Sequence, residues 1–379
     1  MPNPKVPQSS PASSSPFAFS RQSLDCAVGG RSVLDIPRLE VHSRAEAYEF
    51  IRAYGYEPTN AADLEELWAT YNRALSMIRE QLLENGETIP VELSEPTKLE
   101  EISDLLVYAS SREPGTAHLQ RWACAILRVM HVYVHLRNDL FSAFRDEIQG
   151  QILKPLESVI ERSGQLAWLG KDAQIPLERF ELKPFKTTAS SVIKLLARPE
   201  RVALTLLDKL GVRFVTRGIF DSFRVVRFLI DTHIVSYPHI IPDQSANTLY
   251  PLNLFFESMD EIEHSQAGAG AMSDGMINEW LKKSFEESST RAEYLGKLNQ
   301  FSGPDHRFIK FISRKLITVP VGEGELKRSF RFFYPFEIQI MDVETWESTQ
   351  TGPTAHDQYK ERQRKRARER VFGSAHEVL

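Results

Sequence analysis

Cysteine is scarce in this sequence: Cys26 and Cys124 are the two among 379 residues. Two thiols so far apart make neither a disulfide framework nor the closely spaced pairs of a zinc site. Free thiols are typical of proteins from a reducing compartment, so we expect a cytoplasmic protein.

Long apolar runs are missing as well, and no stretch approaches the roughly 20 apolar residues that a membrane-spanning helix needs. We therefore expect no membrane partner. The first residues are rich in proline and serine and lack the apolar core of a secretory signal. We interpret residues 1–20 as a disordered leader.

A general excess of positive charge is also missing, because 46 lysines and arginines stand against 51 acidic residues, for a net charge of −5. Contact with nucleic acid would therefore need a local basic patch. A predicted helix from Asp357 to Val371 carries one. Such a helix is either simply solvated or binds RNA or phosphate, and the pattern leaves both open. Its basic residues are Lys360, Arg362, Arg364, Lys365, Arg366, Arg368 and Arg370.

Residues 21–165 show helical patterning, with Asn60 as a candidate cap, and lack the motifs of a metal enzyme. His131 and His135 have the spacing of two metal ligands on a helix, but no acid stands between them as in HExxH. The His-Asp pair of metal-dependent phosphohydrolases occurs only at His356-Asp357, in a different context. We interpret this half as an all-helical region in which the two histidines belong to a mostly buried helix.

One stretch organises the second half of the chain: Leu207 to Thr216, with Asp208 at its start and Arg213 inside it. Its alternation of apolar and other residues predicts a strand. Gly211 removes a side chain near the start of that strand, which allows a close backbone approach. The residues predicted to share the apolar face are Leu210, Val212 and Phe214.

Residues 336–340 have the pattern of a second strand, with Glu337 and Gln339 on the face opposite three apolar residues. If the two stretches are neighbouring strands, each presents a carboxylate, Asp208 and Glu337. Two such carboxylates can hold a divalent cation against a phosphate. The functional interpretation therefore depends on whether these strands meet.

A basic and hydroxyl stripe precedes the first strand, because Lys186, Ser190 and Lys194 are each one helical turn apart. The stripe either holds polyphosphate or is a solvated helix face. The other predicted elements are a helix from Ser222 to Thr232 capped by Asp221, a strand-loop-strand run over 238–256, an insertion over 257–303, and a hairpin of strands Arg307 to Val321 and Arg328 to Asp342.

Five short motifs, in this order and near this spacing, resemble the RelA/SpoT-type alarmone (ppGpp) synthetase domain. No single motif is specific, but the ordered set is. The resemblance covers roughly residues 180–360. The motifs are Lys186-x3-Ser190-x3-Lys194, Asp208-x2-Gly211-x-Arg213, Asp221-x-Phe223-Arg224-Val225, Glu337-Ile338-Gln339-Ile340 and Gly352-x2-Ala355-His356-x2-Tyr359-Lys360.

The resemblance implies that residues 166–379 form a nucleotidyltransferase-like domain, which includes the insertion and the basic C-terminal helix. The implied fold class is α+β, with a mixed β-sheet of about five strands flanked by helices, after the all-helical region. The implied reaction is the transfer of pyrophosphate from ATP to the 3′-hydroxyl of GDP, GTP or a related nucleotide, with Mg²⁺ as cofactor.

The resemblance also implies roles for individual residues. Asp208 and Glu337 would be the catalytic pair and hold the metal, and Glu337 would alternatively take the proton of the attacking hydroxyl. Phosphoryl transfer needs positioning and charge neutralisation more than covalent chemistry, which agrees with these residue types. Lys186, Ser190, Lys194 and Arg213 would contact the ATP phosphates or adenine, and Gln339, His356, Tyr359 and Lys360 would line the far wall.

The sequence departs from the family pattern at five positions. Pro184 stands where the family has an arginine, and Met341 and Asp342 follow the second strand where the family has Arg-Thr. Leu249 stands at the tyrosine that stacks the acceptor guanine, and Asn253 at a histidine. The ATP side of the site is thus mostly kept, whereas the acceptor side is altered.

Three functions remain open from the sequence. The first is an enzyme that transfers pyrophosphate to a small nucleotide. The second is an enzyme of the same fold that acts on an RNA or tRNA 3′ end, which the basic C-terminal helix favours. The third is a non-catalytic nucleotide-binding regulatory protein, which the departures favour.

Overall fold

The computed structural model divides the chain into two compact units. The first, called here the helical unit, comprises residues 1–139, 187–205 and 361–379, and the second, called the sheet unit, comprises 140–186 and 206–360. Residues 140–165, predicted to belong to the helical region, thus fall in the sheet unit, whereas residues 187–205 and most of the basic helix fall in the helical unit. The structure describes residues 20–84, 86–95, 97–137, 140–164, 166–171, 174–185, 188–198, 207–265, 272–295, 307–322, 328–350 and 356–373, so residues 1–19 of the predicted leader lie outside it.

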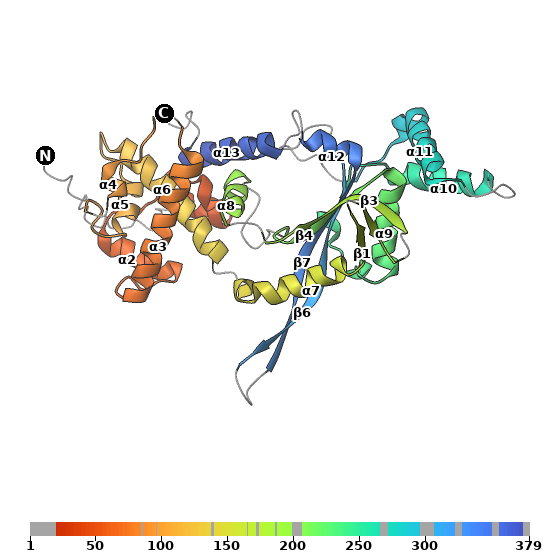
Figure 1. Cartoon of the computed structure of the whole chain (residues 1–379). Helices are drawn as coiled ribbons and strands as arrows, with labels where there is room; N and C mark the ends of the chain where they lie inside the picture. Colours follow the sequence, from red (N-terminus) through yellow and green to blue (C-terminus); the bar gives the residue numbers. More distant parts are fainter. Residues whose placement is uncertain are drawn as a thin grey trace. The chain divides into compact units, whose positions relative to one another are not determined.

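Two helices of the helical unit, α2 and α3, begin at residues whose side chains cap them. Ser43 accepts a hydrogen bond from the backbone of Glu46 to start α2, and Asn60 caps α3 as predicted. Gly55 ends α2 in the left-handed conformation that favours glycine. The helices of this unit (Figure 1) are α1 (Arg21–Ala27), α2 (Arg44–Tyr54), α3 (Ala61–Met77), α4 (Val91–Ser94), α5 (Asp104–Ser110), α6 (Ala117–Arg137), α8 (Thr188–Ala197) and most of α13 (His356–Phe372).

Two arginines attach the end of α13 to the rest of the helical unit. The Arg368 guanidinium forms ion pairs with Glu87 at 2.7 Å and Glu84 at 2.9 Å. Arg370 pairs with Asp35 and also donates to two backbone carbonyls at the end of α8. Both arginines therefore hold this helix in place and are committed to contacts within the chain.

Replacing Arg368 with methionine should lower the free energy of unfolding by about 1–2 kcal/mol, because it leaves two carboxylates without their cation. The pKa of Glu87 is lowered, first by the hydrogen bond from Arg368, so this stabilisation is present above pH 4.5 and is lost as the pH falls below it. Urea denaturation at pH 7 and pH 4 measures both effects.

The matched control is Arg366→Met. Arg366 is exposed on the same helix, and its ion pair within the described part of the chain is with Glu369, one turn away, so its loss should cost less than about 0.5 kcal/mol. Equal unfolding midpoints for the two variants would contradict the attachment of α13 through Arg368.

The described residues of the sheet unit form a mixed sheet of seven strands in the order β1-β2-β3-β4-β7-β6-β5, more than the five or so expected. Neighbouring strands are antiparallel except β4 and β7, which are parallel. The long β6–β7 hairpin was predicted nearly to the residue. The strands are β1 (Ile160–Ser163), β2 (Leu166–Leu169), β3 (Ile175–Lys183), β4 (Gly211–Thr216), β5 (Ala246–Asn247), β6 (Ile309–Val321) and β7 (Arg328–Asp342).

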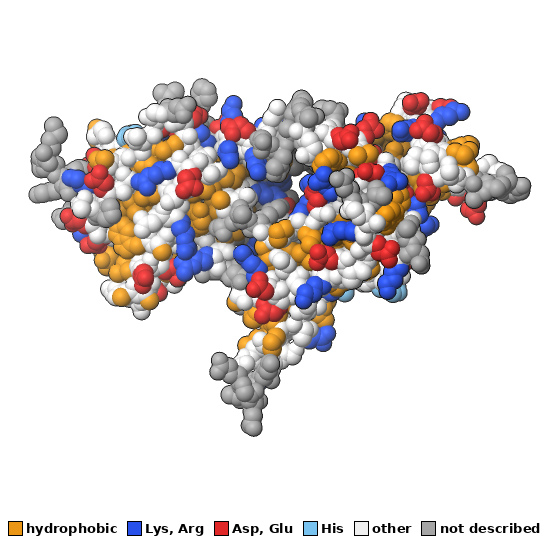
Figure 2. Space-filling view, viewed as in Figure 1, with side chains coloured by type: hydrophobic (Ala, Val, Ile, Leu, Met, Phe, Trp, Pro, Cys, Tyr) orange, Lys and Arg blue, Asp and Glu red, His pale blue; other side chains and the backbone are white. Residues whose placement is uncertain are grey.

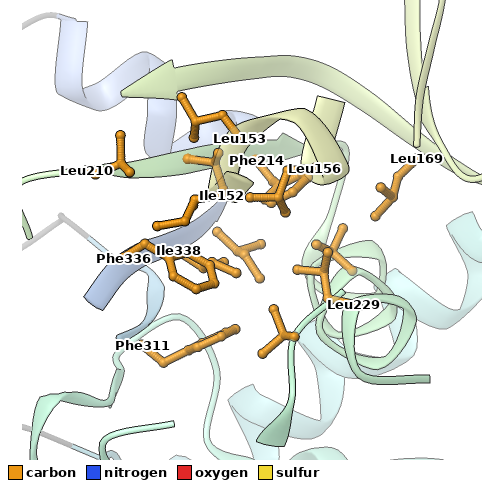
Figure 3. Packing of buried hydrophobic residues seen from close by; sticks show 14 of the residues in the cluster. Ile152, Leu153, Leu156, Leu169, Leu210, Phe214, Leu229, Phe311, Phe336 and Ile338 are labelled. Carbon is orange, nitrogen blue, oxygen red and sulfur yellow. The ribbon is translucent and has the colours of Figure 1, made fainter. Parts of the chain in front are cut away.

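Two helices, α7 (Arg145–Glu157) and α9 (Ile219–Asp231), pack on the apolar face of this sheet. Figure 3 shows Ile152 of α7 and Leu229 of α9 among the strand residues Phe214 and Ile338. All four side chains are almost fully buried. Because side chains alternate along a strand, this packing leaves the neighbouring residues of β4 and β7 to the opposite face. The fold is therefore of the α+β class, as predicted.

Helices α10 (Leu252–Ser265) and α11 (Asp274–Ser288) lie in and beside the predicted insertion. The end of the predicted strand-loop-strand run is helical, because α10 already begins at Leu252. A small core around Tyr250, Leu254 and Leu281 joins these helices. Among the described helices, none has the length and apolar character needed to cross a membrane.

Candidate functional site

Strands β4 and β7 are direct neighbours, which confirms the premise of the site prediction. They run parallel, with Gly211 opposite Glu337 and Arg213 opposite Gln339. Residues opposite each other across a sheet share a face, so Arg213, Glu337 and Gln339 all project from the side away from α7 and α9. The structure therefore brings these three predicted site residues together.

A connected polar network, called here the polar strip, runs across β3, β4 and β7 on that face. The Lys183 ammonium lies 3.1 Å from the Glu337 carboxylate and 2.6 Å from Gln339 Oε1. Arg213 donates to the same Gln339 oxygen at 3.1 Å and to Glu181 at 3.1 Å. The strip thus balances two cations against two carboxylates and holds the cations side by side on one amide oxygen.

The strip is sheltered. Glu337 is 9% exposed and Gln339 is 7% exposed, although both are polar. Buried charges are stable only when they are paired and hydrogen-bonded, which the strip achieves within itself. Charge–charge interactions are also stronger there than in open water, so an anionic ligand would feel both cations strongly.

The absence of a side chain at Gly211 makes this network possible. Lys183 lies opposite Gly211, which in turn lies opposite Glu337, so the lysine reaches across β4 to the third strand. A Cβ atom at Gly211 would lie 2.3 Å from the Glu337 backbone oxygen. Glycine is therefore required for the strand spacing as well as for the path of the lysine.

Asp208 is placed differently from the prediction. It lies ahead of β4, which begins at Gly211, and is therefore not a residue of that strand. Its Oδ1 atom is buried. The expectation that two adjacent strands each present a carboxylate is therefore wrong for Asp208, which belongs to the segment leading into the strand.

The acidic side chains predicted for the site, Asp208 and Glu337, offer carboxylate oxygens. Within the described residues no group of three or more His, Cys, Asp or Glu side chains is arranged to hold a metal. Mg²⁺ is commonly held by one or two carboxylates, with phosphate and water completing its shell. Asp208 and Glu337 are hard oxygen donors of this kind, whereas a tetrahedral zinc site would need more protein ligands.

The other predicted residues belong to other elements or lie outside the described residues. Ser190 is exposed and Lys194 half-buried on α8, which belongs to the helical unit. Lys186 lies outside the described residues, as does the side chain of His356. Tyr359 is half-buried and Lys360 exposed near the start of α13.

Lys183 and Glu181 were missed by the sequence analysis because β3 was not predicted. The signal was present: Phe180 and Leu182 alternate with Glu181 and Lys183, which is the pattern of a half-buried strand. Pro184 stands where the resembled family has an arginine, and the residue just before it, Lys183, is a cation.

Two departures on the acceptor side have structural roles. Leu249 is buried in the core of the sheet unit, 4% exposed. The amide of Asn253 donates to the backbone oxygen of Arg291 and accepts from the backbone of Glu293. Neither side chain is therefore available to stack or bind a base.

The departures after β7 are also structural. Met341 is fully buried. Asp342 accepts a hydrogen bond from the backbone of Thr345 and so caps α12 (Val343–Gln350). An acid at this position therefore serves the start of a helix, which explains its place next to the site.

No known family model matches this chain, and no curated protein does. Among solved structures it is similar to a GTP pyrophosphokinase family protein from Streptococcus pneumoniae. The match has 17% sequence identity, covers 61% of this chain and 88% of that chain, and has a TM-score of 0.27. A likeness at this TM-score carries no argument about activity, which has to come from the site itself.

Proposed function

We propose that the sheet unit is a Mg²⁺-dependent transferase that moves pyrophosphate from ATP to the 3′-hydroxyl of a nucleotide. The polar strip is the observation that carries this proposal. A sheltered carboxylate, Glu337, shares one network with two cations, and a second acid, Asp208, stands at the entry to the adjacent strand. Phosphoryl transfer needs this combination of acid and positive charge.

Each residue of the strip has a role in the proposal. Lys183 and Arg213 bind and neutralise the phosphates of ATP. Gln339 keeps these two cations next to each other, because both donate to its side-chain oxygen. Glu337 holds the metal or takes the proton of the attacking hydroxyl, and Asp208 is its partner in metal binding. Bound Mg²⁺ would supply charge neutralisation at the phosphate oxygens.

In this proposal, the residues that contact the acceptor's base differ from those of the synthetases that the sequence resembles. Leu249 and Asn253 are committed to packing and backbone contacts, so other residues have to contact the acceptor's base. GDP or GTP is one candidate acceptor. An RNA 3′ end is the alternative, favoured by exposed basic residues of α13 such as Lys365, although Arg368 and Arg370 are committed within the chain.

Lys183→Met should weaken Mg·ATP binding about tenfold, because one charge-assisted contact to phosphate is lost while the side-chain length is kept. Calorimetric titration of ATP into parent and variant measures this. Lys315→Met is the matched control: Lys315 is a half-buried lysine on β6, opposite Tyr334 in the hairpin. Its loss should leave the affinity unchanged. Equal ATP affinities for the parent and Lys183→Met would refute the proposal that the polar strip binds ATP.

A further inference from the structure

The helical unit contains a cavity that the proposed reaction does not use. It holds about 130 Å³ of space, and all the residues around it belong to this unit. Its wall is mostly apolar, and includes Leu34, Ile51, Leu106, Met130 and Val134. An apolar cavity of about 150 Å³ is large enough to take up benzene, so this one is large enough for a small apolar group.

The cavity reaches the surface through exposed apolar side chains. Val33, Phe50 and Tyr54 line it and are 42%, 39% and 38% exposed. Figure 2 shows hydrophobic side chains gathered on the visible face of this unit, around α2. Apolar side chains grouped at the entrance of an apolar cavity are typical of a ligand site.

Most polar groups in the wall are already engaged. The Tyr54 hydroxyl lies 2.7 Å from His131 Nδ1. Burial, with a smaller effect from His135, lowers the pKa of His131 to about 4, so its ring is neutral at pH 7. Arg128 is buried and donates to the backbone oxygens of Ile36 and Val371.

Arg38 is the exception. It lines the cavity and is half-buried, and among the described residues it forms neither an ion pair nor a side-chain hydrogen bond. Long basic side chains pack their stem on apolar surface and keep the charge toward water. Arg38 therefore places a positive charge at the water side of an apolar cavity.

We propose that this cavity binds a small amphipathic carboxylate, with the apolar chain inside and the carboxylate on Arg38. A neutral molecule would use the apolar wall alone. A cationic one would be repelled by Arg38 and Arg128. The proposal concerns the helical unit and does not depend on the reaction of the sheet unit.

Titration calorimetry of the full-length protein with butanoate, hexanoate and octanoate tests the proposal. Affinity should rise about fourfold for each methylene buried, until the cavity is full. Octanoate should bind more tightly than octan-1-ol, and octylamine should bind least. Two results would overturn the proposal. One is octanoate that does not bind at a concentration of about 10 mM. The other is octylamine that binds as tightly as octanoate.

Two arginine variants locate the carboxylate. Arg38→Gln should bind octanoate about tenfold more weakly and octan-1-ol as before, because only the charge-assisted contact is lost. Arg112→Gln is the control, since Arg112 is a well-exposed arginine of the same unit that does not line the cavity. Equal octanoate affinities for parent and Arg38→Gln would refute the assignment of the carboxylate to Arg38.

Discussion

Glu337→Gln should lower the rate of pyrophosphoryl transfer by about 10²–10³-fold, because it removes the carboxylate to which the proposal assigns metal binding or proton transfer. The amide keeps the shape of the side chain and can still accept a hydrogen bond from Lys183. Since the Lys183–Glu337 ion pair is only partly buried, the cost in stability should stay below about 2 kcal/mol. Steady-state rates and urea midpoints, measured on the same preparation, separate the two effects.

The matched control is Glu344→Gln, at an exposed acid on α12 just after β7. It removes the same charge without touching the strip, so its rate should equal that of the parent. Asp208→Asn should behave like Glu337→Gln if the acid ahead of β4 shares the metal. Full activity in Glu337→Gln would exclude a catalytic role for the strip.

Gly211→Ala should lower the free energy of unfolding by about 3 kcal/mol, because the new Cβ would lie 2.3 Å from the Glu337 backbone oxygen and 2.9 Å from its Cβ. Backbone cannot move aside as a flexible side chain does, so β4 and β7 have to separate. The separation would also shift Glu337 away from Lys183. We therefore expect weaker ATP binding in the fraction that still folds.

Gly150→Ala is the control for this substitution. Gly150 lies within α7. Apart from the helix backbone, the nearest atom to a Cβ at this position would be Lys154 Cε, at 3.8 Å. Alanine is the better helix former, so this variant should be stabilised by up to about 1 kcal/mol. Denaturation midpoints of the two variants should thus move in opposite directions. A Gly211→Ala midpoint equal to that of the parent would contradict the close approach of β4 and β7.

Elements with long, regular patterns could be predicted from the sequence. The β6–β7 hairpin was predicted at Arg307 to Val321 and Arg328 to Asp342, and the structure has Ile309–Val321 and Arg328–Asp342. Long alternation with glycines between the strands leaves few other arrangements. The face shared by Glu337 and Gln339 followed from the same alternation, whereas the pairing of β4 with β7 was a premise that the structure supplies.

Elements set by tertiary contacts could not be predicted in this way. The helical patterning of residues 21–165 includes Ile148, Ile152 and Leu156, which recur at helical spacing, yet α7 ends at Glu157 and β1 begins at Ile160. Short apolar runs do not distinguish a helix from a strand. Gly164 then takes a positive φ of 63° in the turn between β1 and β2.

The role of Asp221 also depends on tertiary packing, which the sequence pattern does not give. Asp221 was predicted as a helix cap, but it lies inside the first turn of α9, 2% exposed, and pairs with Arg224 at 2.9 Å. Burial raises its pKa, with Arg224 opposing the shift. Sequence spacing identified the acid and its arginine, whereas the depth at which they lie depends on the packing of α9 against the sheet.

Incubation of the pure protein with γ-labelled ATP, Mg²⁺ and either GDP and GTP or bulk tRNA tests the central claim most directly. Pyrophosphoryl transfer moves the label onto the acceptor and releases AMP in equal amount, and we predict this outcome with a nucleotide acceptor. Label that appears instead on tRNA, again with AMP released in equal amount, would show that the acceptor is an RNA 3′ end. If ATP binds in calorimetry but stays intact with every acceptor, the proposal of an enzyme is contradicted. The protein would then be a non-catalytic nucleotide-binding protein.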